Sequence, residues 1–395
     1  MTGTNADSGW VRTWGASPQA PDAAVAALEP FAGATLRQEV RVSGGGRRVR
    51  VRFTNEYGTG PLAIGAARVG LAASGGAIQP GSDRVLTFAG RSTADVPAGA
   101  PILSDPVDLP VAALARLSIS LYVPGPVASC TGHGRPVEAG WMIPGDAVAA
   151  PELPAGARGL LVRALISAVE VLPDGPARVV VTLGDSLVDG FGSAPDADRS
   201  WPDRLAERLA GRDGPAVHVS NQGISGNRIL NGGHGDAALA RFDRDVLATP
   251  GLGYVVVAEG INDIAISYAP RDDPFLAEFL TMFPGGPVTA DDVIAGHRQL
   301  IARAHDRGVR IYAATMTPAE GMEIYTAAGE SVRRTVNAWI RTGGAFDGVL
   351  DFDAVWRDPD HPSRIRDGFH MGDHGHGNDA GYRALADSID LSLFT

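Results

Sequence analysis

Groups that could do acid–base chemistry lie in four short segments of the C-terminal half of the chain, residues 184–187, 221–227, 259–263 and 373–382. Each segment places hydroxyl, amide, imidazole or carboxylate groups beside small residues. A serine hydroxyl is a weak nucleophile unless a base removes its proton during attack. The neutral imidazole of histidine can accept that proton near pH 7. Ser186 and the histidines of the last segment therefore predict nucleophilic catalysis by a serine.

These segments stand where a parallel sheet would gather them. The run 179–183 is almost continuously apolar, as expected of a parallel strand covered on both faces. Further strands are predicted at 217–220, 254–258, 309–314 and 348–352, and helices at 201–209, 236–247, 291–307, 331–341 and 379–393. Strands that alternate with helices indicate βαβ units and a doubly wound sheet. In such sheets ligands bind beyond the carboxyl ends of the strands, where the first three segments lie.

The first half of the chain has a different pattern. Residues 36–42 and 48–53 largely alternate apolar and polar side chains, as half-buried strands do, and the intervening Ser-Gly-Gly-Gly at 43–46 predicts a hairpin. Other strands are predicted at 84–88, 117–123 and 164–171. The pattern predicts an all-β sandwich or jelly-roll domain. Pro-Asp-Gly-Pro at 173–176 predicts the boundary, which gives domains 1–172 and 173–395, and the Pro-rich stretch 267–287 predicts an insertion near the site.

The four chemical segments resemble those of the SGNH, or GDSL-type, serine hydrolase family. Ser186, Gly223, Asn262 and His376 match the four residues for which that family is named, and Asp373 lies three positions before the histidine. The resemblance covers about residues 178–393 and implies a flavodoxin-like sheet. Residues 35–42 and 48–62 resemble the N-terminal β domain of some bacterial members.

The resemblance also implies a role for each residue. Ser186 attacks an ester carbonyl, His376 acts as base and then acid, and Asp373 orients the imidazole. The oxyanion is stabilised by the N–H of Ser186, the N–H of Gly223 and the Asn262 amide; a side chain at 223 would crowd the substrate. No cofactor is implied, and activity is expected to fall below about pH 6–7 as the imidazole becomes charged.

The last segment departs from the family pattern in two ways. Gly377 stands where members often have proline, which predicts a more mobile loop. A second Asp-x-x-His pair, Asp367 and His370, lies six residues upstream. His376 is preferred as the base because Asn378 and the Ala-Gly-Tyr sequence at 380–382 follow it.

Composition excludes several other kinds of protein. The net charge of −11 argues against binding to nucleic acid or anionic membranes. The single cysteine, Cys130, excludes an intrachain disulfide and a four-cysteine metal site. All 34 basic residues are arginine, which excludes Schiff-base lysines, Ser-Lys dyads and the P-loop. There is no apolar run long enough to span a membrane, and the polar start 1–10 does not resemble a secretory signal, which predicts a cytoplasmic protein unless a signal was removed.

The sequence thus predicts a serine esterase for short-chain carboxylic esters, with a small-molecule or carbohydrate ester as substrate and acetyl groups on sugars as one candidate. A lipase- or thioesterase-type acylhydrolase is an alternative, as is a glycan-binding protein with an inactive hydrolase domain. Metal-assisted hydrolysis is a third, because four histidines and two aspartates crowd one glycine-rich segment: His361, Asp367, His370, Asp373, His374 and His376.

Overall fold

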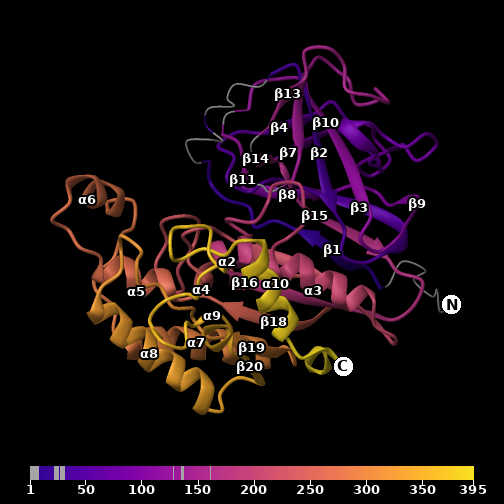
Figure 1. The fold of residues 1–395 in the computed structure, drawn as a ribbon. Helices are drawn as coiled ribbons and strands as arrows, with labels where there is room; N and C mark the ends of the chain where they lie inside the picture. The colour runs from indigo at the N-terminus through magenta and orange to yellow at the C-terminus, as the bar shows by residue number, and fades with distance from the viewer. Residues whose placement is uncertain (1–8, 22–25, 27–31, 128, 135–137, 161) are drawn as a thin grey trace. The chain divides into compact units, whose positions relative to one another are not determined.

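The computed structural model describes residues 9–21, 26, 32–127, 129–134, 138–160 and 162–395, so most of the polar start lies outside the described residues. The chain forms two compact units (Figure 1). The first, the β unit, contains the described residues of 1–177 with 195–198 and 210–220; the second, the α/β unit, contains 178–194, 199–209 and 221–395. The chain therefore passes between the units more than once.

Two antiparallel sheets make up most of the β unit. The first has the order β1-β15-β3-β8, with β9 also paired to β3, and the second has the order β13-β12-β2-β10-β5-β6. Short pairs β11–β14 and β4–β7 complete the unit. This confirms the predicted all-β class. The strands are Val11–Gly15 (β1), Ala34–Arg41 (β2), Gly46–Asn55 (β3), Leu62–Ile64 (β4), Ala66–Leu71 (β5), Arg84–Val85 (β6), Ala94–Val96 (β7), Ala100–Leu103 (β8), Val107–Val111 (β9), Arg116–Val123 (β10), Gly132–Gly134 (β11), Gly140–Pro144 (β12), Arg158–Gly159 (β13), Val162–Ala164 (β14) and Ile166–Leu172 (β15).

The predicted hairpin at 43–46 is wrong. β2 pairs with β10 and β12, whereas β3 pairs with β15, β8 and β9 in the other sheet. The glycines carry the chain between the sheets through a crowded passage. A Cβ at Gly46 would lie 2.7 Å from the Leu172 carbonyl oxygen, and one at Gly45 would lie 2.9 Å from the Ala113 nitrogen. The glycine run therefore meets a packing requirement that depends on residues far along the chain.

A five-stranded sheet forms the centre of the α/β unit, although residues 216–220 of its edge strand are grouped with the β unit. Its order is β17-β16-β18-β19-β20, and the pairs β16–β18, β18–β19 and β19–β20 are parallel. Numbered along the chain this is the 2-1-3-4-5 order of flavodoxin-like sheets, with its switch point beside the first strand. The predicted fold class is confirmed. The strands are Ala177–Gly184 (β16), Ala216–Gly223 (β17), Leu252–Ala258 (β18), Arg310–Ala314 (β19) and Gly348–Leu350 (β20).

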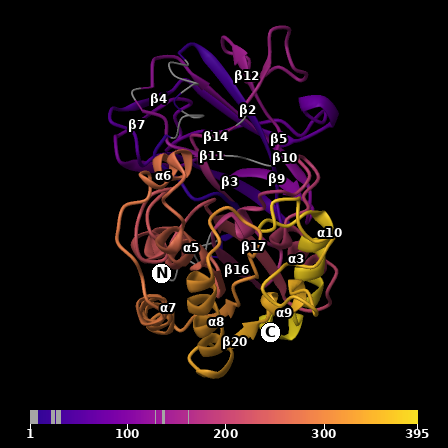
Figure 2. The same cartoon turned by 60° about the vertical axis from the view of Figure 1, so that its left-hand side comes forward.

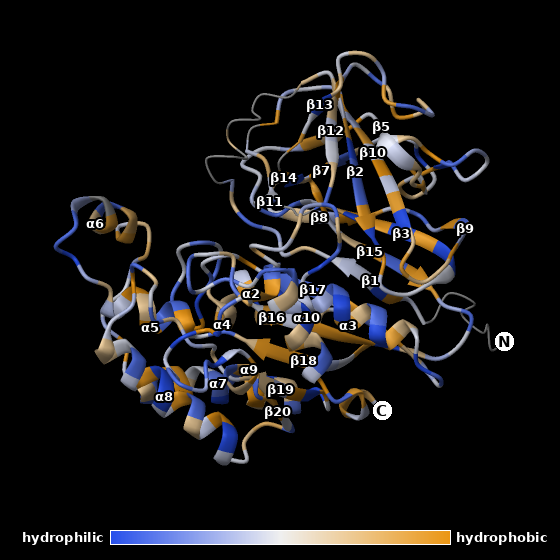
Figure 3. Cartoon of the chain, viewed as in Figure 1, coloured by the Kyte–Doolittle hydropathy of each residue, from blue (hydrophilic) through white to orange (hydrophobic). Residues whose placement is uncertain are grey.

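Helices cover both faces of this sheet. Figure 2 shows α7 and α8 on one side and α3, α9 and α10 on the other. In Figure 3 the strand β18 is coloured as hydrophobic, while the helices alternate between polar and apolar colours. The helices are Ser186–Asp189 (α2), Trp201–Ala210 (α3), Ala238–Phe242 (α4), Ile261–Tyr268 (α5), Pro274–Leu280 (α6), Ala290–His305 (α7), Ala327–Thr342 (α8), Phe352–Trp356 (α9) and Asp379–Ser388 (α10).

Element ends differ from the predictions where a polar side chain interrupts the pattern. The predicted strand 348–352 stops at Leu350, because Asp351 caps α9 by accepting a hydrogen bond from the Ala354 N–H. The predicted helix 236–247 is α4 followed by a π-helical turn at Asp243–Leu247. The stretch 267–287 holds the end of α5 and the short helix α6. Within the described ranges, every helix is too short or too polar to cross a bilayer.

Candidate active site

Ser186 lies at the carboxyl end of β16, as the first residue of α2. Asp185 caps this helix: its side chain accepts a hydrogen bond from the Leu187 N–H at 3.0 Å. The preceding Gly184 is required by packing, since a Cβ there would collide with the Ala258 carbonyl of β18. The turn from strand to helix therefore presents the Ser186 hydroxyl above the edge of the sheet, with Asp185 turned inward as a cap.

The structure brings the predicted serine, histidine and aspartate together. Ser186 Oγ lies 2.8 Å from His376 Nε2, and His376 Nδ1 lies 2.5 Å from Asp373 Oδ2. The other carboxylate oxygen accepts hydrogen bonds from the N–H groups of Gly375 and His376, at 3.1 and 3.0 Å. Burial alone would raise the pKa of Asp373, but these hydrogen bonds hold it well below its ordinary value. Asp373 is therefore an ionised carboxylate beside the imidazole at neutral pH.

The loop that carries His376 is anchored to α10. Asn378 caps that helix by accepting from the N–H groups of Ala380 and Gly381, and its amide donates to the carbonyls of Gly368 and His370. Gly377 packs against the buried Trp356: a Cβ there would lie 2.7 Å from the indole ring. The departure from proline at 377 thus has a local cause, because the tryptophan fills the space that a side chain would need.

The competing Asp-x-x-His pair does not reach the serine in the same way. His370 Nδ1 accepts from the N–H groups of Gly372 and His374, and its ring lies 4.5 Å from the His374 ring. Asp367 is exposed. Nowhere in the part of the chain that the structure describes do three or more His, Cys, Asp or Glu side chains gather in a way that could hold a metal ion.

Asn262 lies in the first turn of α5, directly after β18. Its Nδ2 donates to the Asn227 carbonyl at 3.0 Å, and an amide nitrogen has a second hydrogen to offer. Asp263 binds the same segment after β17: its carboxylate accepts hydrogen bonds from the N–H groups of Ile229 and Leu230, at 2.7 and 3.0 Å. The start of α5 is thus fastened to the segment that follows β17.

Gly223 does not have the geometry that the sequence suggested. Its N–H donates to Asn221 Oδ1 at 2.8 Å. A Cβ at 223 would lie 2.7 Å from both the Val188 carbonyl carbon and the Asp189 Cα. The glycine is therefore required by contact with α2 rather than by room for a substrate.

Gly226 is a second glycine of the same segment that sequence reasoning did not single out. It adopts a left-handed φ of 79°, and its N–H has no acceptor among the described residues. Its neighbours are anchored on either side: Ser225 donates to Asp189 Oδ2, and the Asn227 carbonyl accepts from Asn262. The sequence contains no signal that the Gly223 N–H donates a hydrogen bond to Asn221 while the Gly226 N–H does not donate to a protein group within the described part of the chain.

Carboxyl groups are buried beneath this edge of the sheet. Burial raises the pKa of Asp185 and of Asp263 to about 6, and it raises the pKa of Glu259 well above its ordinary value. The ring of Phe191 meets the His376 imidazole edge-on, with ring centres 4.7 Å apart. Phe191 was not predicted as part of the site, because its proximity to His376 depends on packing between distant segments.

Comparison with known proteins identifies the family of the chain. The model of the GDSL-like lipase/acylhydrolase family matches residues 182–384, and the chain belongs to this family. No curated protein matches the chain.

Among solved structures, one similar chain is a member of the lipolytic protein G-D-S-L family from Veillonella parvula, with 16% identity over 55% of this chain and 98% of that chain and a TM-score of 0.40. Another is the M. smegmatis aryl esterase, with 16% identity over 55% of this chain and 98% of that chain and a TM-score of 0.41. A catalytic mutant of an acetylxylan esterase from Geobacillus stearothermophilus shares 22% identity, over 54% of this chain and 93% of that chain, with a TM-score of 0.40.

Proposed function

We propose that this protein is a serine esterase that cleaves short-chain carboxylic esters through an acyl-serine intermediate. The observation that carries the proposal is the hydrogen-bonded series from Ser186 Oγ through the His376 imidazole to the Asp373 carboxylate. A serine that is activated by an oriented imidazole is the arrangement that acyl transfer requires.

In the proposed reaction, Ser186 Oγ attacks the ester carbonyl carbon while its proton passes to His376 Nε2. The tetrahedral intermediate collapses with cleavage of the bond to the alcohol oxygen, and His376 gives that oxygen its proton. Water then attacks the acyl-serine by the same route and releases the acid. Asp373 accepts the hydrogen bond from Nδ1 and stabilises the imidazolium that forms in both halves.

The negative oxygen of the intermediate needs fixed donors. We assign this role to the N–H of Ser186, which is at the start of a helix where N–H groups are unpaired, and to the second amide hydrogen of Asn262. Gly226 is a better third donor than Gly223, because the Gly223 N–H already donates to Asn221. Gly223 could serve only if the Asn221 side chain moved away.

The apolar groups beside the imidazole favour an acyl chain over a charged group. Phe191 packs against the His376 ring, and the N–H of Met371 donates to the His376 carbonyl at 2.9 Å. Met371 is 49% exposed, so its thioether is available to contact a substrate. We therefore propose acyl esters as substrates, and the family resemblance favours short acyl chains, including acetyl groups on carbohydrates.

The experiment compares wild type, Ser186→Ala and Ser193→Ala on p-nitrophenyl acetate. We expect Ser186→Ala to lose at least about 10⁴-fold in kcat/KM. Ser193 is the matched control, because it is a buried serine of the same region whose hydroxyl donates to the Gly190 carbonyl. Turnover that survives in Ser186→Ala would reject the proposed nucleophile, and absence of turnover in the wild type would favour the glycan-binding alternative.

Substrate range is tested with p-nitrophenyl esters of increasing acyl length beside acetylated sugars. A maximum at short chains is expected; a maximum at long chains would indicate a lipase-type acylhydrolase instead. Activity that disappears with a chelator and returns with a metal ion would support the metal-assisted alternative.

A further inference from the structure

One arginine beneath the candidate site is in contact with several of its segments. Arg241 belongs to α4, and its side chain is completely buried. Its guanidinium donates to the carbonyl of Gly184 at 3.1 Å, to the carbonyl of Gln222 at 2.7 Å and to Asn227 Oδ1 at 3.0 Å. Each acceptor lies next to a group with a proposed role. Gly184 is two residues before the nucleophile, and Gln222 and Asn227 lie at the two ends of the segment that contains Gly226.

Asn227 connects this arginine to the proposed oxyanion donor. Its side chain accepts from Arg241 Nε, and its carbonyl accepts from Asn262 Nδ2. Its own amide donates to the carbonyls of His234 and Asp236, at 2.8 and 2.9 Å. Displacement of the Asn227 side chain would therefore move the carbonyl that sets the orientation of the Asn262 amide.

The chemistry of the guanidinium suits this arrangement. Its N–H groups diverge in a rigid plane, so one side chain can hold three acceptors at fixed angles, which an ammonium cannot do. Asp245 Oδ2 lies 3.2 Å from Nη1 and balances the buried charge. The Glu259 carboxyl lies 3.9 Å from Nη2, and neither of its oxygens has a hydrogen-bond partner among the described residues.

We propose that Arg241 is a positioning residue of the active site: through the Asn227 side chain it fixes the carbonyl that orients the Asn262 amide, while its bonds to Gly184 and Gln222 hold the guanidinium itself in place. This inference rests on the proposed esterase function. Arg241 touches neither the substrate nor the reacting atoms, so its effect is on the alignment of the donors that meet the oxyanion. Loss of alignment lowers transition-state stabilisation and leaves ground-state binding nearly unchanged.

The test is a double-mutant cycle on p-nitrophenyl acetate with wild type, Arg241→Lys, Asn262→Ala and the double variant. We expect Arg241→Lys to lower kcat by about 10- to 100-fold with KM changed by less than about threefold. In the Asn262→Ala background the same substitution should cost less than about threefold, because the donor that Arg241 aligns is already gone. Equal losses in both backgrounds, or an unchanged kcat in Arg241→Lys, would overturn the inference.

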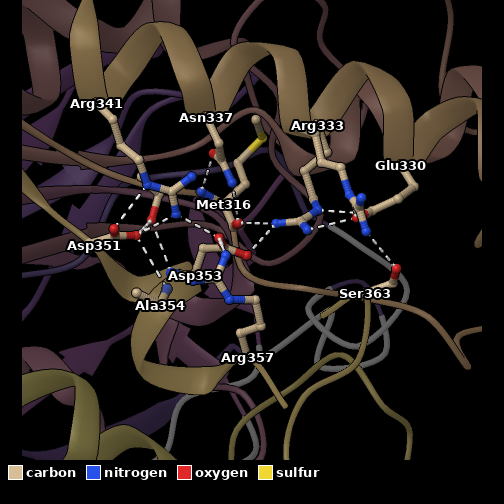
Figure 4. A network of polar contacts seen from close by, with 12 residues as sticks. Met316, Glu330, Arg333, Asn337, Arg341, Asp351, Asp353, Ala354, Arg357 and Ser363 are labelled. Carbon is tan, nitrogen blue, oxygen red and sulfur yellow. Dashed lines mark hydrogen bonds and ion pairs between the residues drawn. The ribbon is translucent and has the colours of Figure 1, made fainter. Parts of the chain in front are cut away.

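Arg333 provides a matched control elsewhere in the α/β unit. It is also buried, and it donates to the Met316 carbonyl, to Glu330 and to Asp353 (Figure 4). Arg333→Lys makes the same chemical change in a network that does not contact Ser186, Asn262 or His376 within the described residues. We expect it to lower the unfolding temperature without changing kcat per folded molecule. A kcat loss equal to that of Arg241→Lys would show that any disturbed buried arginine has this effect, and would reject the positioning role.

If Arg241→Lys fails to fold, Asn227→Ala supplies the same information, since it removes the hydrogen bond from Arg241 Nε to the Asn227 side chain and keeps both the Asn227 carbonyl and the bonds of Arg241 to Gly184, Gln222 and Asp245. It should show the same kcat loss and the same dependence on Asn262. Ser186→Ala separates the two proposals. If Ser186→Ala loses activity while the Arg241 and Asn227 variants keep the wild-type kcat, the proposed esterase function stands and the positioning role of Arg241 is rejected. A wild type without turnover would reject both.

Discussion

At the scale of single residues, the site depends on which of several similar groups point toward Ser186. The sequence contains two Asp-x-x-His pairs, and the residues that follow His376 favour the second pair. Folding joins His376 to the serine and to Asp373, whereas His370 accepts from nearby backbone N–H groups. The two histidines therefore differ in where their rings point. The hydrogen bonds of Asn378 and the packing of Gly377 against Trp356 fix the loop that carries His376.

Replacement of the orienting carboxylate tests this assignment. We expect Asp373→Asn to lower kcat by about 10³- to 10⁴-fold, because an amide favours the wrong tautomer of the imidazole and cannot stabilise its charged form. Asp367→Asn makes the same change at an exposed position and should leave kcat within about twofold. Steady-state kinetics on p-nitrophenyl acetate measures both. The reverse ranking would assign the orienting role to Asp367.

At the scale of elements, glycines mark the places where backbone segments or large rings come close together. Gly223 lies against α2, Gly45 and Gly46 carry the chain between two sheets, and Gly377 lies against the Trp356 ring. None of these positions requires a positive φ. Their requirement is for space, and the group that occupies the space comes from another element.

The loop of His376 gives a stability prediction at this scale. Gly377→Ala would place a methyl group 2.7 Å from the buried Trp356 ring, and overpacking of this kind costs about 1–3 kcal/mol. Gly286→Ala is the control, because a Cβ there has nothing within 4 Å. Denaturant unfolding of both variants measures the difference. A Gly377→Ala protein as stable as wild type would mean that Trp356 can shift away from the loop.

At the scale of the whole molecule, buried titratable groups make stability depend on pH in two opposite directions. His297 is buried between Trp339 and Phe346, with both ring nitrogens unpartnered among the described residues, and burial lowers its pKa to about 4. The unfolded chain binds a proton near pH 6.5, so this group's share of the stability is present above that pH and is lost as the pH falls toward 4. Glu259 acts in the opposite sense, because its raised pKa penalises the folded state above the ordinary value of 4.5.

Replacement of the histidine should remove part of the acid sensitivity. His297→Phe keeps a ring against Trp339. We expect its melting temperature to fall less than that of the wild type when the pH is lowered from about 7.5 to about 5. The exposed His361 serves as the control position, and His361→Phe should follow the wild-type curve. Parallel curves for His297→Phe and wild type would contradict a buried neutral imidazole.

Replacement of the glutamate should raise stability only where the unfolded chain would ionise it. Glu259→Gln keeps a neutral side chain of the same shape, so we expect a higher melting temperature at about pH 7–8 and little change at about pH 4. Glu278→Gln, at an exposed position, should be neutral at both. A lower melting temperature of Glu259→Gln at pH 7 would mean that Glu259 is ionised and pairs with Arg241.

Local patterns were sufficient for most of the fold and for the three central groups of the site. Apolar runs and helical periodicity depend on neighbours along the chain, so the strands and helices of the α/β unit were predicted with shifted ends. Predictions were wrong or incomplete where long-range contacts decide: β2 and β3 lie in different sheets, and β20 stops at the cap of α9.

The sequence by itself determined that this chain alternates strands and helices from residue 179 and that a serine, an amide, an aspartate and a histidine stand at the edges where a parallel sheet binds ligands. Only the tertiary structure decided that the Gly223 N–H already donates to Asn221, and that the Arg241 side chain reaches the carbonyl of Gly184, 57 residues earlier in the chain. Hydrophobic patterning is a local property that selects the elements, whereas the direction of a hydrogen bond is set by residues that only folding brings together.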